Sequence, residues 1–226
     1  MVKAILFDLD NTLMDFLRMK HDCISAAVFA MIGAGLPVSA DKAKKVLYKI
    51  YDKHGMEYKH VFEDFLKVIN KKIDYRILAA GIIAYRKAQI SLIEPYPNVI
   101  PTLIKLRERG YKLAIVSDAP RLKAWIRLVE LKLDHFFDLV VAFGDVKERK
   151  PSRIPFEKAL KELKLKPEEV MMVGDQPAKD VGGARKLGMQ TCFALYGYEQ
   201  YNKTKKLNVK ADHIINDISE LTKILK

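Results

Sequence analysis

Cysteine, long apolar runs and repeated segments are all scarce in this sequence. Its two cysteines, Cys23 and Cys192, lie far apart without a CxxC spacing, which argues against the usual zinc and redox motifs and predicts buried free thiols. No stretch reaches the roughly 18 uncharged residues that a membrane span needs. No basic segment followed by an apolar one opens the chain, so no secretory signal is predicted. We therefore expect a cytoplasmic protein with no membrane partner.

The chain is rich instead in apolar residues and in positive charge. Half of its 226 residues are hydrophobic, which is enough for a substantial core in one domain, or in one domain with a large insertion. Forty basic residues against 28 acidic ones give a formal charge of +12, a balance that favours anionic partners such as phosphorylated metabolites or nucleic acid. Because the lysines are scattered and not interleaved with aromatics, a solvated surface explains them better than a nucleic-acid site.

The stretch AILFDLDNT at residues 4–12 is the candidate active site. Its four successive apolar residues predict a strand buried on both faces in a parallel sheet. Asp8 would emerge at the carboxyl end of this strand, where such sheets form their ligand crevice, and Asp10 can face the same crevice. The repulsion between the two acids favours a bound Mg²⁺. A polar strand end followed by an ordinary Asp-Asn-Thr turn is the alternative.

The rest of the chain predicts a sheet core with a helical insertion. Residues 16–92 repeat apolar positions at helical spacing in four segments, with Ser39 and Gly55 as candidate boundaries of the second helix. Strands then alternate with helices, which is typical of a parallel sheet covered on both faces. The fold class is therefore α/β, a three-layer Rossmann-like core formed by residues 1–15 and 93–226. An all-helical, four-helix unit of residues 16–92 is inserted after the first strand.

Within the core, the apolar pattern predicts the position of each strand and helix. The predicted strands after the first are 112–116, 139–143, 170–173, 191–195 and 214–215. One predicted helix carries Leu122, Trp125, Ile126 and Val129, and another extends over residues 178–187.

Four polar residues fall at or after the ends of these predicted strands. Ser117 offers a hydroxyl to a phosphate oxygen or, equally well, caps the next helix. Lys150 supplies a point charge for a phosphoryl group. Asp175 and Asp180 can complete a metal site with Asp8, or serve as ordinary first-turn acids of a capped helix. Since the carboxyl ends of parallel strands meet at one edge, we expect these side chains to converge there.

The ordered series Asp-x-Asp-x-Thr, Ser, Lys-Pro and Gly-Asp-x-x-x-x-Asp resembles the haloacid dehalogenase (HAD) superfamily across nearly the whole chain. The resemblance implies a Mg²⁺-dependent phosphatase that acts on a small phosphorylated metabolite, with the helical insertion as a cap. Dehalogenases of the superfamily typically lack an acid two residues after the first Asp, so Asp10 favours phosphate chemistry.

The resemblance also implies a role for each matching residue. Asp8 would be the nucleophile that becomes an aspartyl phosphate, and Asp10 the acid and base that moves protons. Ser117 and Lys150 would bind the phosphate. The implied metal site consists of Asp8, the backbone carbonyl of Asp10, and Asp175, with Asp180 in a supporting position.

Two positions depart from the superfamily pattern and leave substrate preference open. Asp118 stands where Asn is frequent and adds negative charge near the proposed phosphate site, and Gln176 replaces the usual Ser or Thr. Two other functions remain as alternatives. One is a phosphotransferase or phosphomutase that uses the same aspartyl phosphate. The other is a basic nucleic-acid-binding protein on an inactive fold, which the complete set of acids disfavours.

Overall fold

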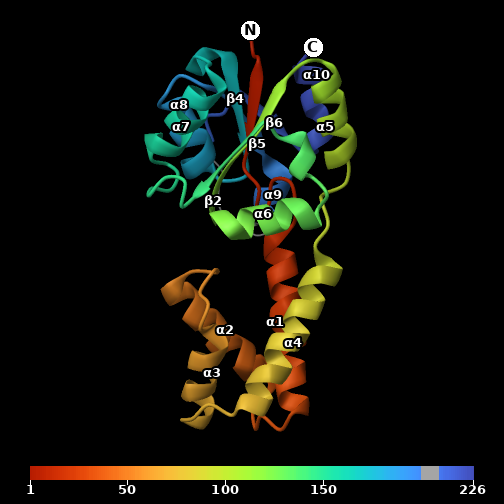
Figure 1. Cartoon of the computed structure of the whole chain (residues 1–226), viewed down its shortest axis with the longest axis vertical. Helices are drawn as coiled ribbons and strands as arrows, with labels where there is room; N and C mark the ends of the chain where they lie inside the picture. Colours follow the sequence, from red (N-terminus) through yellow and green to blue (C-terminus); the bar gives the residue numbers. More distant parts are fainter. Residues whose placement is uncertain (200–208) are drawn as a thin grey trace. The chain divides into compact units, whose positions relative to one another are not determined.

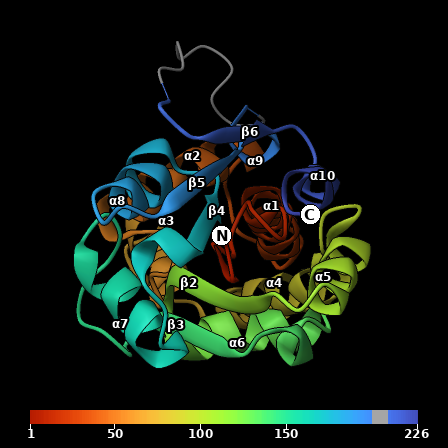
Figure 2. The same cartoon turned by 90° about the horizontal axis from the view of Figure 1, so that it is seen from above.

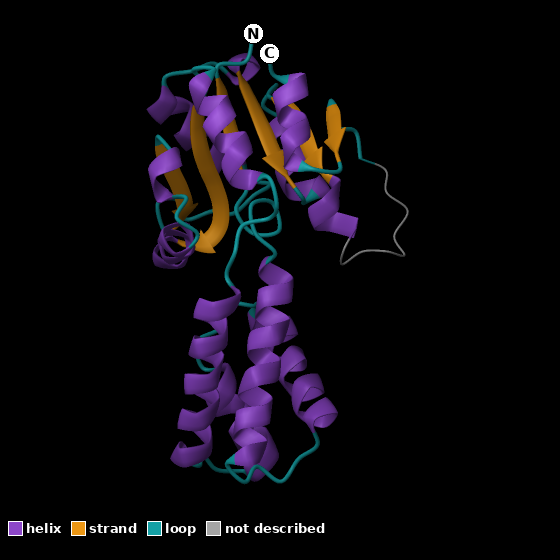
Figure 3. Cartoon of the chain, turned by 90° about the vertical axis from the view of Figure 1, so that its right-hand side faces the viewer, coloured by secondary structure: helices purple, strands orange, loops and turns teal. Residues whose placement is uncertain are grey.

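The computed structural model describes residues 1–199 and 209–226. The chain divides into two compact units, one formed by Met1–Asp15 with Glu94–Lys226 and the other by Phe16–Ile93. The first unit contains the sheet and the second contains helices (Figures 1 and 3). Within the described residues, no helix combines the length and apolar character needed to cross a membrane. Cys23 and Cys192 are free and buried, as predicted.

The first unit is built on a parallel sheet, which has six strands within the described part of the chain. These are β1 Ala4–Phe7, β2 Lys112–Pro120, β3 Leu139–Phe143, β4 Val170–Gly174, β5 Gln190–Ala194 and β6 His213–Ile215. Their order is β3-β2-β1-β4-β5-β6, seen from above in Figure 2. All four residues of β1 are buried, as expected for an unbroken apolar run in a central strand.

Helices cover both faces of this sheet. The helices are α5 Val99–Glu108, α6 Arg121–Glu130, α7 Arg153–Leu163, α8 Gly182–Arg185, α9 Leu195–Glu199 and α10 Leu221–Ile224. Phe156 of α7 packs in one cluster with Leu6 and Met172, and Figure 1 shows α5 and α10 on the opposite side of the sheet from α7. The α/β, Rossmann-like architecture predicted from the alternating pattern is therefore confirmed.

Short turns of helix complete this unit. They are 3₁₀ turns at Asp134–Phe136, Pro167–Glu169 and Ile218–Glu220, and a π-helical turn at Pro177–Val181. The helix predicted over residues 178–187 is confirmed only in part, because its first residues form the π turn and the α-helix that follows, α8, ends at Arg185. A π turn is wider than an α turn and is frequent at functional sites. Here it carries Asp180, which is fully buried.

The predicted end of β2 is wrong, and one of the two alternatives for Ser117 is excluded. β2 continues to Pro120, with an irregularity between Ser117 and Pro120, so Ser117 lies inside the strand instead of following it. The N-cap of α6 is Pro120, which excludes Ser117 as the cap. A bulged strand end of this kind re-aims side chains and is frequent beside active sites.

The helix predicted around Trp125 exists as α6, but its apolar stripe does not face the core. The four side chains that predicted the helix are 37–71% exposed; they are Leu122, Trp125, Ile126 and Val129. The buried residues of α6 are Ala124, Arg127 and Leu128. The helix therefore buries an arginine and leaves these four apolar side chains at the surface.

The second unit consists of four helices with a core of their own (Figure 3). They are α1 Phe16–Gly33, α2 Ala40–His54, α3 Val61–Asn70 and α4 Tyr75–Leu92. Buried side chains from all four helices form one cluster that includes Ile24, Leu47, Phe65 and Leu78. Each helix contributes an apolar stripe that it cannot bury alone, which explains why the four segments fold as a unit.

Helix boundaries in the second unit agree only in part with the sequence. Gly55 ends α2 with a φ of 87°, a backbone conformation that glycine adopts readily. Ser39 occupies the N-cap position of α2, but its side chain makes no capping hydrogen bond. Asp74 caps α4 instead, because its side chain accepts from the backbone N–H groups of Arg76 and Ile77.

Candidate active site

The strand order explains why two acids from distant parts of the chain meet. The chain passes from β1 to β2 and β3 on one side, and then places β4 on the other side of β1. Ligands bind at such a switch point, beyond the carboxyl ends of the strands. Asp8 follows β1 and Asp175 follows β4, and the backbone N–H of Asp8 donates to the carbonyl of Val173 at 2.9 Å. The two acids therefore leave adjacent strands at the same edge.

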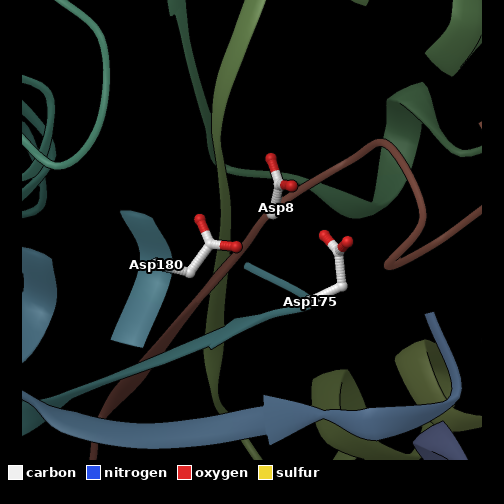
Figure 4. A group of neighbouring side chains, drawn as sticks. All are labelled: Asp8, Asp175 and Asp180. Atoms are coloured by element: carbon white, nitrogen blue, oxygen red, sulfur yellow. The ribbon is translucent and has the colours of Figure 1, made fainter. Parts of the chain in front are cut away.

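Three buried carboxylates converge at this edge. Oxygens of Asp8, Asp175 and Asp180 lie within 4.8 Å of one another. Figure 4 shows the three side chains turned toward a common space. Burial and the neighbouring carboxylates raise the pKa of Asp175 and of Asp180, since each disfavours a further negative charge. The cluster therefore needs positive charge to exist in its ionised form.

Lys150 supplies part of that charge. Its ammonium lies 2.7 Å from an oxygen of Asp8 and 2.6 Å from an oxygen of Asp180, and it donates to the carbonyl of Val116 at 2.8 Å. Burial alone would lower the pKa of Lys150, but the carboxylates of Asp180 and Asp8 outweigh it, so the pKa is raised. Lys150 is therefore a buried, charged lysine shared between two acids.

The residues present fit a divalent cation. One ammonium faces three carboxylates, so negative charge remains in excess in the cluster. The donor atoms are all oxygens, which hard cations such as Mg²⁺ prefer. The cluster contains Asp8 and Asp175, two of the implied metal ligands, and Asp180, which was expected only in a supporting position. Asp10, which was expected to bind the metal through its backbone carbonyl, contributes no carboxylate to this cluster.

Asp180 is fixed by the chain around it. One of its oxygens pairs with Lys150, and the other accepts from the backbone N–H of Gln176 at 2.9 Å. A Cβ atom on Gly174 would collide with the carboxylate of Asp180, so the close approach requires glycine at the end of β4. Gly174 therefore has a steric role at the end of β4, in addition to the metal-site role proposed for Asp175, the residue that follows it.

Gln176, which departs from the superfamily pattern, contacts the cluster directly. Its side-chain amide donates to Asp175 at 2.6 Å, and the hydroxyl of Thr12 donates more weakly to the other oxygen of Asp175 at 3.4 Å. Tyr196 donates to the carbonyl of Thr12 at 2.7 Å and so ties α9 to the loop after β1. No pattern in the sequence indicated the part played by Tyr196.

Asp118, the other departure, has its charge balanced. One oxygen accepts from the backbone N–H of Lys150 at 2.9 Å, and the other lies 3.2 Å from the ammonium of Lys179. Asp118 therefore holds the loop that carries Lys150 and does not add an unpaired negative charge. Ser117, the residue before it, is buried, and its hydroxyl accepts from the backbone N–H of Ala119 at 3.2 Å.

Asp10 is bound by a residue that the sequence did not indicate. Its Oδ2 accepts a hydrogen bond of 2.7 Å from the guanidinium of Arg127 on α6. The arginine side chain is 3% exposed, whereas that of Asp10 is 22% exposed. An arginine among apolar helix positions carries no signal in a single sequence, because it is more often a surface residue.

Comparison with known proteins decides the family. The family described as haloacid dehalogenase-like hydrolase matches residues 5–194, a range that includes the three clustered acids, Lys150 and Arg127. This chain belongs to the haloacid dehalogenase-like hydrolases. The HAD-superfamily resemblance seen in the sequence is thereby confirmed.

Relatives of this haloacid dehalogenase-like hydrolase are phosphatases. It is 37% identical over 226 residues to the glyceraldehyde 3-phosphate phosphatase of Methanocaldococcus jannaschii, covering 100% of this chain and 98% of the relative. It is 35% identical over 159 residues to pyrophosphatase PpaX of Halalkalibacterium halodurans, covering 69% and 73%. A HAD phosphatase from Thermococcus onnurineus superposes with a TM-score of 0.70 at 29% identity, covering 99% and 98%. The chain is therefore a hydrolase of the phosphatase type.

Proposed function

We propose that this hydrolase is a Mg²⁺-dependent phosphatase that cleaves a small phosphomonoester through an aspartyl phosphate on Asp8. The observation that carries the proposal is the position of Lys150, 2.7 Å from Asp8 and within a cluster of three buried carboxylates. Phosphoryl transfer depends mainly on positioning and on charge stabilisation. A carboxylate held by an ammonium at a strand end supplies both.

In the first half of the reaction, a carboxylate oxygen of Asp8 attacks the phosphorus and the bond to the leaving oxygen breaks. Asp10 gives a proton to that oxygen as it departs. In the second half, Asp10 takes a proton from the water that attacks the phosphorus of the acyl phosphate. Inorganic phosphate leaves and Asp8 is restored as a carboxylate. Lys150 and Ser117 would contact the phosphoryl oxygens throughout.

Asp8, the backbone carbonyl of Asp10, and Asp175 would hold the Mg²⁺, which supplies neutralising charge to the phosphoryl group. Gln176 and Thr12 orient the carboxylate of Asp175 through their hydrogen bonds. Asp180 would support the site from outside, since it is bonded to Lys150 and to the backbone of Gln176.

We propose a three-carbon phosphate as the substrate class, with glyceraldehyde 3-phosphate as its first candidate. The support is that the relatives of that name from Methanocaldococcus jannaschii and Methanothermobacter thermautotrophicus align with 100% of this chain. The helical unit Phe16–Ile93 would act as the cap that selects the substrate, because it is inserted directly after the loop that carries Asp8 and Asp10.

The test is a panel of glyceraldehyde 3-phosphate, pyrophosphate and p-nitrophenyl phosphate. Each is assayed with Mg²⁺ and with chelator, for the natural protein, Asp8→Asn and the surface control Asp134→Asn. We expect turnover that chelator abolishes, that Asp8→Asn lacks and that Asp134→Asn keeps, with the triose phosphate preferred over pyrophosphate. Turnover that persists in Asp8→Asn would exclude the aspartyl phosphate.

The same assay separates hydrolysis from transfer. A second sugar is added as an acceptor, and phosphorus is followed as inorganic phosphate and as sugar phosphate. We expect inorganic phosphate at every acceptor concentration. Phosphorylated acceptor as the main product would establish the phosphotransferase alternative instead.

A further inference from the structure

Helix α6 is turned in a way that its composition does not favour. It exposes four apolar side chains, Leu122, Trp125, Ile126 and Val129, and buries Arg127. Removing a guanidinium from water is costly unless a charged partner is present. A charged partner of Arg127 is Asp10, whose Oδ2 lies 2.7 Å from a guanidinium nitrogen. The orientation of the helix is therefore matched to a contact with the loop after β1.

The contact joins two segments far apart in the sequence. Asp10 lies two residues beyond Asp8, in a loop closed by the hydrogen bond from Asn11 N–H to the carbonyl of Met14 at 2.8 Å. The loop thus fixes the backbone position of Asp10, but two side-chain torsions of Asp10 still determine where its carboxylate lies. A planar, always charged guanidinium restricts both of them through a directional bond.

We propose that Arg127 is a positioning residue, which holds the carboxylate of Asp10 where it exchanges a proton with the leaving oxygen. The inference depends on the proposed function, because it assigns the role of Arg127 through Asp10. In this role Arg127 acts through its hydrogen bond to Asp10, and Asp10 is the group that exchanges the proton. Other charged residues near the start of α6 have different partners and do not share this role. Asp118 pairs with Lys179, and Arg121 pairs with Asp145 and donates to the carbonyl of Gly144.

The leaving group distinguishes this role from a structural one. An alkoxide that departs from an alkyl phosphate needs a proton, because its conjugate acid is weak. A p-nitrophenolate departs without one. Loss of a well-placed acid therefore slows the alkyl ester more than the aryl ester. A general loosening of the fold would slow both substrates alike.

The test compares kcat and KM for glycerol 3-phosphate and p-nitrophenyl phosphate in the complete Mg²⁺-loaded protein. We expect Arg127→Met to lower the alkyl-to-aryl ratio of kcat about ten-fold or more, with KM little changed. Arg127→Lys should lower the ratio less than Arg127→Met does, since lysine keeps the positive charge but lacks the planar, forked donors of the guanidinium. Arg127→Gln keeps a neutral hydrogen-bond donor in a shorter side chain and serves if the methionine variant does not fold. Arg121→Met is the matched control on α6, with an unchanged ratio.

Combination with Asp10→Asn decides whether Arg127 acts through Asp10. In that background we expect Arg127→Met to have no further effect on the ratio, because the group that it positions is already gone. An unchanged ratio in Arg127→Met, or a full additional loss in the double variant, overturns the inference while the proposed function stands. If Asp10→Asn alone leaves the ratio unchanged, the proton-transfer role of Asp10 fails, and the inference fails with it.

Discussion

Lys150 and Arg127 are two buried cations that contact two acids of one short loop, but they are held differently. Lys150 lies in a loop after β3 and is shared between Asp8 and Asp180, at 2.7 and 2.6 Å. Arg127 extends from the middle of α6 to Asp10 at 2.7 Å. The first contact is part of a network from three strand ends, and the second connects one helix to the loop.

The difference predicts how far the loss of each cation should spread. Lys150 balances a cluster in which every carboxylate faces the others, so its removal leaves buried negative charge beside Asp8. Arg127 reaches the acid that is proposed to move protons. We therefore expect loss of Lys150 to affect folding and every substrate, and loss of Arg127 to affect the step that depends on Asp10.

Replacement of Lys150 by methionine should have the largest effect. We expect phosphatase activity to fall by about 10²–10³-fold on alkyl and aryl substrates alike. In the metal-free protein, the free energy of unfolding should fall by about 3–5 kcal/mol, because breaking a buried pair leaves uncompensated charge. Urea unfolding followed by the fluorescence of Trp125, the single tryptophan, measures the change in the first unit.

The matched control for this variant is Lys158→Met. Lys158 also pairs with an acid, Glu162 at 2.7 Å, but its side chain is 41% exposed. An exposed pair of this spacing on a helix contributes only about 0.3–0.5 kcal/mol. Equal destabilisation by the two variants would show that the cluster around Lys150 does not depend on its charge.

The same contrast explains how much of the fold the sequence could predict. β1, β3 and the four helices of the second unit follow from local period and stop signals, which a single sequence contains. The orientation of α6 does not, because Trp125 and its apolar neighbours indicate a core face that the ion pair of Arg127 overrides. The π turn after β4 also depends on a tertiary contact, between Gly174 and Asp180.

The candidate site divides in the same way. Asp8, Lys150 and Asp175 lie near strand ends, and the rule that parallel strands present their ends at one edge was enough to group them. Arg127 and Tyr196 lie on helices, and their side chains reach the loop after β1 only through tertiary packing. Residues of this kind can be assigned to the site only from a structure, because their spacing in the sequence is the same whether their side chains face solvent or the site.

Metal binding should change the stability of the protein by less than the loss of Lys150 does, and it tests the same carboxylate cluster. We expect Mg²⁺ at 100 times its Kd to stabilise the protein by about 2.7 kcal/mol, measured as an increase in melting temperature. Asp175→Asn should abolish the increase and Asp134→Asn should keep it. An increase that survives in Asp175→Asn would place the metal elsewhere.

The effect of Mg²⁺ should grow with pH. Burial and neighbouring carboxylates raise the pKa of Asp175 above its unfolded value, near 3.9. In the metal-free protein, protonated Asp175 therefore favours the folded state. This stabilisation is complete below the unfolded-state pKa and is lost as the pH rises through the higher folded-state pKa. The cation offsets the charge that then appears. A difference between metal-free and Mg²⁺-loaded protein that shrinks with rising pH would contradict this sign.

Gly174→Ala should displace one member of the Lys150 network without changing any charge. The new Cβ would collide with the carboxylate of Asp180, and overpacking of this kind costs about 2 kcal/mol. The Mg²⁺-dependent increase in melting temperature should fall with it. Gly33→Ala is the control, because open space surrounds a Cβ there and alanine in a helix is neutral to slightly stabilising, by up to about 1 kcal/mol. If Gly174→Ala and Gly33→Ala changed stability and the Mg²⁺-dependent increase to the same extent, a collision of the new Cβ with Asp180 would not explain the result.

The smallest effect is expected at two helix starts in the second unit, where two polar residues again look alike in the sequence but bond differently. Asp74→Ala removes two hydrogen bonds to the first turn of α4 and should destabilise that turn by about 1 kcal/mol. Amide hydrogen exchange there should accelerate about five-fold. Ser39→Ala should leave exchange in α2 unchanged, because the serine makes no capping bond. Faster exchange in Ser39→Ala would mean that the residue type, and not the observed hydrogen bond, determines the helix start.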